Sequence, residues 1–163
     1  MYWYLPNANT DFRVSLFWVH GLNVSSSRKP MPKTILLADD SPIIGLTLYR
    51  ALATEGSYDL CAQAADGSEA ISLAKRYKPD LVILDLAMPK MNGLETAREL
   101  KKIMPTVPII LHTIHASTIQ ELFAGDSCVD LVIPKGDFAN LMNHVRTLLF
   151  AGSGEDDKQF SEH

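Results

Sequence analysis

The chain has 163 residues, of which 47% are hydrophobic, and its formal net charge at pH 7 is −4. This length supports one globular domain with its own core and is too short for two. The acidic balance, with no Lys/Arg-rich run beyond Arg28-Lys29, lacks the electrostatic pattern of a nucleic-acid-binding protein, so we expect no direct nucleic-acid contact.

Cysteine spacing and hydropathy exclude several further classes. Cys61 and Cys128 show neither CxxC nor Cys/His spacing, so we expect two small buried thiols rather than a disulfide or a zinc site. No apolar run approaches the roughly 20 residues of a membrane-spanning helix. The richest early run, residues 14–24, also lacks the basic start and the cleavage site of a signal peptide. We therefore expect a cytoplasmic protein without membrane insertion.

Residues 1–32 differ from the rest of the chain. They hold both tryptophans and six of the Phe, Trp and Tyr residues, yet they show no sustained period of 2 or 3.6. We expect an N-terminal extension, either disordered or produced by a start assigned upstream of Met31. An aromatic segment that docks on a partner remains the alternative.

From Thr34 onward, short apolar runs alternate with amphipathic segments, which is the pattern of βαβ units. The strands are predicted at residues 34–38, 60–64, 81–84, 108–113 and 131–134. The helices are predicted at residues 42–55, 68–77, 93–104, 118–124 and 138–150. Their N-caps are Ser41, Asp66 and Asp137, and Gly56 ends the first helix. The alternation predicts an α/β domain.

Polar residues follow four of the predicted strands. Asp39 and Asp40 come after the first strand, Asp85 after the third, Thr113 at the end of the fourth and Lys135 after the fifth. Ligands of open parallel sheets bind outside the carboxyl ends of the strands. We therefore expect these five side chains to converge on one rim.

This combination of side chains suits phosphoryl transfer to a carboxylate. Three carboxylates would repel one another unless a cation lies between them, and Mg²⁺ (or Mn²⁺) prefers such oxygen ligands. With charge neutralised, Asp85 is suited to attack a phosphoryl group. The hydroxyl of Thr113 and the ammonium of Lys135 are suited to bind its oxygens.

Four motifs in order resemble the receiver domains of two-component response regulators. They are the pair Asp39-Asp40, the run 85–93 with sequence DLAMPKMNG, Thr113, and Pro134-Lys135. The resemblance covers residues 33–150. It implies a three-layer, doubly wound (βα)5 fold with a five-stranded parallel sheet in the flavodoxin-like order 2-1-3-4-5. Residues 151–163, with four acidic residues and one lysine, are expected to form a disordered acidic tail.

The resemblance also implies a role for each matching acidic residue. Asp85 would be phosphorylated. Asp40 would bind Mg²⁺ directly and Asp39 mainly through water, while the backbone carbonyl of Ala87 would complete the protein's share of the metal shell. Ala87 also occupies a position at which the residue type affects the rate of dephosphorylation in the family.

Around the phosphate, the chain matches the family at two positions and departs from it at others. Thr113 would be the switch hydroxyl, and Lys135 would pair with the phosphoryl group. Many receivers carry Tyr or Phe where Val132 stands, so an aromatic switch is not expected. Ile114 is larger than the small residue usual after the switch Thr, and His115 occupies a second position that tunes dephosphorylation.

Structural roles remain open for several of these residues. Asp39 or Asp40 is compatible with a turn or cap, Thr113 with a β-branched strand residue and Lys135 with a solvated loop. For His115, a surface histidine is the favoured interpretation. We expect Gly93 to serve the turn after Asn92 rather than the chemistry.

The leading functional hypothesis is phosphorelay signal transduction. A sensor histidine kinase or histidine phosphotransfer protein would phosphorylate Asp85 and so alter binding of a downstream protein, or formation of a homodimer through the face of strands four and five. The alternative is a receiver that is weakly phosphorylated or unphosphorylated and acts as a constitutive interaction module. Beyond catalysing its own phosphorylation and dephosphorylation, we expect no enzyme activity. A haloacid-dehalogenase-type phosphatase needs Asp where Ala87 stands, and no GxGxxG supports dinucleotide binding.

Overall fold

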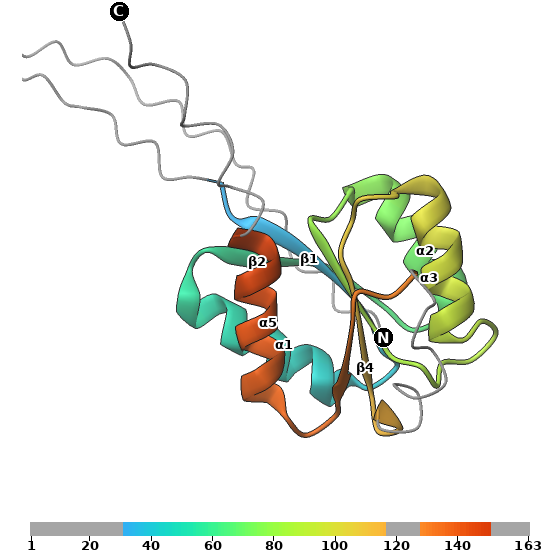
Figure 1. The fold of residues 1–163 in the computed structure, drawn as a ribbon. Coiled ribbons are helices and arrows are strands. Elements are labelled where there is room, and N and C mark those ends of the chain that lie inside the picture. The colour runs from blue at the N-terminus through green and yellow to red at the C-terminus, as the bar shows by residue number, and fades with distance from the viewer. Residues whose placement is uncertain (1–30, 117–127, 151–163) are drawn as a thin grey trace, which may run out of the picture.

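A computed structural model of the chain describes residues 31–116 and 128–150. Its centre is a five-stranded parallel sheet in the order β2-β1-β3-β4-β5 (Figure 1). The strands are β1 (Lys33–Ala38), β2 (Tyr58–Ala64), β3 (Leu81–Leu84), β4 (Ile109–Thr113) and β5 (Leu131–Pro134). The helices are α1 (Pro42–Glu55), α2 (Gly67–Tyr77), α3 (Gly93–Ile103) and α5 (Phe138–Phe150). The predicted fold class and strand order are confirmed.

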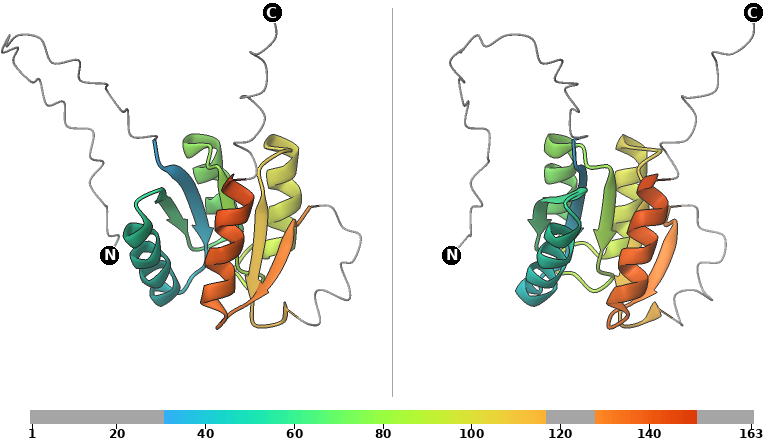
Figure 2. Two further views of the ribbon diagram at one scale, coloured as in Figure 1. Left: turned by 60° about the vertical axis from the view of Figure 1, so that its left-hand side comes forward. Right: turned by 90° about the vertical axis from the view of Figure 1, so that its left-hand side faces the viewer.

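Helices cover both faces of the sheet, which gives three layers. α1 and α5 lie on one face, and α2 and α3 lie on the other (Figure 2). Two separate hydrophobic clusters correspond to these faces, one containing Leu48 of α1 and Val145 of α5, the other Ala74 of α2 and Leu100 of α3. The sheet is therefore buried on both sides, as is usual for a parallel sheet.

β3 shows why an uninterrupted apolar run was a good predictor of the central strand. All four of its residues are buried, and the strand pairs with both β1 and β4. Leu81 and Ile83 contact the α1–α5 cluster, whereas Val82 and Leu84 contact the α2–α3 cluster. Alternate side chains of a strand point to opposite faces, so a strand between two helical layers needs apolar residues at every position.

Local signals in the sequence begin and end the helices. The side chain of Asp66 accepts a hydrogen bond from the Glu69 N–H at the start of α2. Asn92 and Glu95 form a capping box at the start of α3. Gly56 ends α1 with a φ of 63°, a left-handed conformation that glycine adopts without steric cost.

The cap of α1 differs from the prediction. Ser41 occupies the N-cap position, but its side chain makes no capping hydrogen bond. The carboxylate of Asp39 instead accepts the backbone N–H of Ser41 at 2.9 Å. The predicted boundary and N-cap position are correct, but the Ser41 hydroxyl does not bind the first turn of α1; Asp39 binds the N–H of the N-cap residue itself.

Other differences concern element ends. β2 begins at Tyr58 rather than at residue 60, and α3 ends at Ile103 rather than at residue 104. Cys128 is buried as predicted, whereas Cys61 is only partly buried, because β2 is an edge strand. The predicted helix at 118–124, residues 1–30 of the predicted extension at 1–32, and the predicted tail at 151–163 lie outside the described residues.

Within residues 31–116 and 128–150, every helix is too short or too polar to cross a bilayer.

Candidate functional site

Two aspartates, Asp39 and Asp40, lie directly after β1 at the carboxyl edge of the sheet. The backbone N–H of Asp39 continues the pairing with β2 by donating to the carbonyl of Ala64 at 3.0 Å. The Asp39 side chain is buried, with 1% of its surface exposed, while Asp40 is exposed. Gln63 fixes the same corner, because its Nε2 donates to the Asp39 carbonyl at 2.9 Å. One carboxylate of the pair is thus fixed in the protein and the other faces solvent.

Asp85 lies directly after the central strand. Its backbone N–H donates to the carbonyl of Ala38 at 2.7 Å, which holds it beside the end of β1. Its side chain is 7% exposed. Because β3 lies between β1 and β4, Asp85 occupies the middle of the rim.

Gly93 packs against the backbone of Asp85. A Cβ atom at position 93 would lie 2.3 Å from the carbonyl oxygen of Asp85, far inside van der Waals contact. Among the described residues, the glycines with positive φ are Gly56 and Gly136, so backbone freedom does not explain Gly93. The prediction that Gly93 serves the turn after Asn92 was therefore wrong. Its physical reason is close approach to Asp85, which spacing alone does not reveal.

β4 and β5 place the hydroxyl and the ammonium group. The backbone N–H of Lys135 donates to the carbonyl of Thr113 at 2.9 Å, so the two residues are neighbours across the strand ends. The Thr113 side chain is fully buried, and its Oγ1 accepts the backbone N–H of His115 at 3.2 Å. The Lys135 side chain is 17% exposed.

The structure brings four of the predicted side chains into one cluster. Carboxylate oxygens of Asp39, Asp40 and Asp85 all lie within 4.8 Å of one another. Lys135 Nζ lies 2.8 Å from Asp39 Oδ2 and 2.9 Å from Asp85 Oδ2. Burial by itself favours the neutral amine, but hydrogen bonds and charge from the two carboxylates outweigh it and raise the pKa of Lys135 above its ordinary value.

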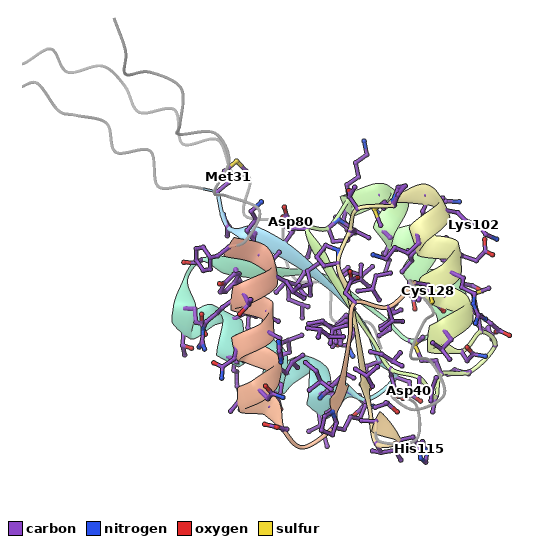
Figure 3. All side chains as sticks on the ribbon, in the orientation of Figure 1. Met31, Asp40, Asp80, Lys102, His115 and Cys128 are labelled. Carbon is purple, nitrogen blue, oxygen red and sulfur yellow. The ribbon has the colours of Figure 1, made fainter. Side chains whose placement is uncertain are left out.

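The donor set suits a hard divalent cation. Three carboxylates offer oxygen atoms close enough together to share one ion, and the exposed Asp40 leaves a path from solvent. Mg²⁺ is usually held by one or two carboxylates and keeps several waters, which fits a site that is partly open. Asp40 lies at the same end of the molecule as His115 and at the opposite end from Asp80 (Figure 3).

The remaining predicted residues contribute no side chain to this cluster of described residues. Ala87 and His115 are exposed, and Val132 is partly buried against the α2–α3 cluster. Ile114, directly after Thr113, is 71% exposed. The larger side chain at this position therefore projects into solvent beside the rim.

Sequence reasoning missed one polar residue near the site. His112 is 1% exposed, and neither ring nitrogen has a hydrogen-bond partner among the described residues. Burial, and next the charge of Lys135, lower the pKa of His112, while Asp39 and Asp85 oppose that shift. A histidine directly after three apolar residues of a predicted strand was the available signal, because buried polar atoms normally have partners.

Comparisons with known proteins agree with this geometry. A family model described as the response regulator receiver domain matches residues 35–146. The chain is 42% identical over 79 residues to the transcriptional regulatory protein PdtaR of Mycobacterium tuberculosis, covering 47% of this chain and 38% of PdtaR. It is 36% identical over 81 residues to the chemotaxis protein CheY of Thermotoga maritima, covering 50% of this chain and 67% of CheY.

A solved structure supports the same grouping. The response regulator protein TrrA of Thermotoga maritima, in complex with Mg²⁺-BeF, is 36% identical with a TM-score of 0.64, and the match covers 72% of this chain and 99% of that chain. Among the first curated relatives, by contrast, the chain spans 26% to 50% of their lengths. Since the family model covers well over half of the sequence, the chain belongs to the family of response regulator receiver domains, the receiving domains of two-component signalling systems.

Proposed function

We propose that this receiver domain accepts a phosphoryl group on Asp85 from a phosphohistidine and thereby changes its affinity for a downstream protein. The donor is a sensor histidine kinase or a histidine phosphotransfer protein. The observation that carries the proposal is the convergence of Asp85 with two further carboxylates within 4.8 Å and with the Lys135 ammonium at 2.9 Å. Charged groups of both signs at one rim suit the transfer of an anionic group.

The transfer needs only groups that the rim supplies. A carboxylate oxygen of Asp85 forms a bond to phosphorus while the P–N bond to the donor histidine breaks, and the electron pair of that bond returns to the imidazole nitrogen. Lys135, already 2.9 Å from Asp85, pairs with a phosphoryl oxygen. The Thr113 hydroxyl accepts a hydrogen bond at its oxygen and can still donate its own proton to a second phosphoryl oxygen.

A divalent cation completes this arrangement. Asp39, Asp40, Asp85 and the backbone carbonyl of Ala87 are the groups that would hold Mg²⁺ or Mn²⁺. When bound, the ion supplies positive charge that offsets repulsion between the carboxylates and the incoming phosphoryl group. Asp39 is buried and already accepts the Ser41 N–H through Oδ1, which leaves Asp40 as the carboxylate with greater freedom to bind the ion directly.

Phosphorylation would alter the partners of Lys135. In the structure this side chain is shared between Asp39 and Asp85. A dianionic group on Asp85 competes for the same ammonium and for Thr113, and so favours one of two arrangements of the β4–β5 region. Because Val132 is not aromatic, the change would pass through Thr113 and Lys135 to the downstream partner or to a phosphorylation-dependent homodimer.

The test is direct phosphorylation of the full chain. The protein is incubated with Mg²⁺ and acetyl phosphate and its intact mass is compared with that of Asp85→Asn. We expect the intact protein to gain one phosphoryl group, Asp85→Asn to gain none, and EDTA to abolish the gain. Asp59→Asn, which changes an exposed aspartate of β2, serves as the matched control and should be phosphorylated normally. An intact protein that gains no mass would contradict the proposal and favour a constitutive interaction module.

A further inference from the structure

The loop that follows Asp85 contains a strained turn. The N–H of Met91 donates to the carbonyl of Pro89 at 2.7 Å, which closes a three-residue turn with Lys90 at its centre. Lys90 has a φ of 63°. Turns of this kind with a positive φ at a non-glycine residue are rare and persist only when surrounding contacts hold them.

One such contact is an ion pair to the start of α2. Lys90 Nζ lies 2.5 Å from Asp66 Oδ2, although the Lys90 side chain is 72% exposed. The Asp66 side chain is 8% exposed, and its other oxygen accepts the Glu69 N–H at 2.9 Å. The helix cap therefore orients Asp66, so the anion that binds Lys90 is itself fixed.

A second contact joins the same two segments. A Cβ atom on Gly67 would lie 2.0 Å from Thr96 Oγ1 and 3.0 Å from Met91 Cβ. The first residue of α2 thus packs directly against the end of the loop and the first turn of α3. The loop is held at Lys90 by charge and at Met91 by close packing.

We propose that Lys90 and Asp66 form a positioning pair for the metal site, holding the loop that carries the Ala87 carbonyl in the conformation that binds Mg²⁺. Ala87 lies between Asp85, fixed at the end of β3, and Lys90, fixed to α2. Each anchor restricts the backbone from one side. This inference rests on the proposed function, because it concerns the affinity of the same site.

A purely electrostatic effect of the pair and a positioning effect predict different changes in Mg²⁺ affinity, so the two can be distinguished. If the pair acted only through its charges, removing the cation with Lys90→Met would strengthen Mg²⁺ binding, and removing the anion with Asp66→Asn would weaken it. If the pair acts by positioning, both substitutions weaken binding. The double variant is then no weaker than either single variant, since both remove the same contact. Asparagine is also a good N-cap, so α2 should remain intact in Asp66→Asn.

The measurement is Mg²⁺ affinity of the full chain by isothermal titration calorimetry, with Mn²⁺ binding followed by electron paramagnetic resonance as a second readout. We expect each single variant and the double variant to bind the ion about three- to fivefold more weakly, the scale of one exposed ion pair. Lys90→Arg should stay within about twofold of the intact protein, because the longer cation can still reach Asp66.

A matched control removes a similar ion pair elsewhere. Lys102 is 68% exposed and pairs with Glu99 at 2.6 Å on α3. It lies far from Asp40 (Figure 3). Lys102→Met should leave Mg²⁺ affinity unchanged, and urea unfolding of each variant checks that the fold is retained.

Two results would overturn the inference while leaving the proposed function intact. Opposite shifts in Lys90→Met and Asp66→Asn would show that only charge matters. Unchanged affinity in both would show that the pair has no role at the site. An intact protein that binds no Mg²⁺ would instead overturn the proposed metal site, and this inference with it.

Discussion

The ammonium group of Lys135 lies 2.9 Å from Oδ2 of Asp85, although the two residues follow different strands of the sheet. The same ammonium lies 2.8 Å from Asp39 Oδ2. One partly buried cation thus serves two buried carboxylates. This arrangement makes the stability of the domain depend on the groups of its proposed site.

Removing this cation should destabilise the fold. Lys135→Met leaves Asp39 and Asp85, whose side chains are 1% and 7% exposed, without their ion-pair partner. Loss of one member of a buried pair costs several kcal/mol, and since Lys135 is itself 17% exposed, we expect about 2 kcal/mol less unfolding free energy in EDTA. Urea denaturation of Lys135→Met and of the intact protein measures this difference in unfolding free energy. If the proposed metal site is correct, Mg²⁺ should restore part of this loss, because an ion held by the carboxylates of the folded protein stabilises that state.

The control for Lys135→Met is an exposed lysine of another ion pair. Lys33 is 51% exposed and lies 3.0 Å from Asp80. Lys33→Met should cost no more than about 1 kcal/mol and show no dependence on Mg²⁺. Equal losses in the two variants would contradict the special role assigned to Lys135.

Gly93→Ala should be more damaging than a typical glycine substitution. The new Cβ would lie 2.3 Å from the Asp85 carbonyl oxygen, so the backbone at Asp85 must move, and we expect a loss of about 3 kcal/mol in unfolding free energy. Gly56→Ala is the matched control, because it meets no atom within 4 Å and is strained only by its φ of 63°, which costs about 1 kcal/mol. Urea unfolding compares them, and a Gly93→Ala protein as stable as Gly56→Ala would argue against the steric explanation.

His112 should make the fold sensitive to mild acid. Burial lowers its pKa, so the unfolded chain takes up a proton at this position more readily than the folded protein. The contribution of neutral His112 to the unfolding free energy is fully present above the pKa of a histidine in the unfolded chain, about 6.5. It is lost as pH falls below that value, by up to about 1.4 kcal/mol per pH unit. We expect His112→Leu to lose less stability between pH 7.5 and 5.5 than the intact protein in urea titrations.

The exposed histidine His115 provides the control for this pH effect. His115→Gln should leave the pH dependence of unfolding unchanged. The interpretation fails if His112→Leu and the intact protein lose stability in parallel over the same pH range.

The thiol of Cys61 should react slowly despite its edge-strand position. Burial raises the pKa of Cys61 to about 11. At pH 8 the thiolate fraction is then about 10²-fold lower than in an unfolded chain, and alkylation by iodoacetamide should slow to a similar extent. Mass spectrometry of a Cys128→Ala variant isolates the Cys61 reaction, with the same variant in urea as the reference. Equal rates in the folded and unfolded protein would refute the prediction.

Much of the fold was predictable because the relevant interactions are local or depend on burial alone. The run at Leu81–Leu84 is apolar at every position, which indicates a strand between two helical layers, and β3 has these bounds. Asp66 and Gly56 mark helix ends through backbone chemistry within a few residues. The N-cap position at Ser41 was correct, but sequence patterns do not show that the Ser41 side chain makes no capping hydrogen bond or that Asp39 accepts the Ser41 N–H.

The candidate site likewise has features that the sequence predicts and features that it does not. The positions of Asp39, Asp85 and Lys135 at strand ends follow from the alternation of strands and helices, since parallel strands bring their carboxyl ends to one edge. The sharing of Lys135 between the two carboxylates, and the burial of His112 beside Thr113, depend on distances that spacing does not encode.

What the sequence determined by itself is therefore the order of the elements and the chemical types at the rim, because periodicity and strand-end position depend on residues close together in the chain. Only the tertiary structure decided that Gly93 must lack a Cβ atom, and that Lys90 is paired with Asp66. Both relationships join segments that meet only after the sheet and its helices have packed. Their physical basis is the approach of particular atoms within a few ångströms, which hydrophobic patterns do not specify.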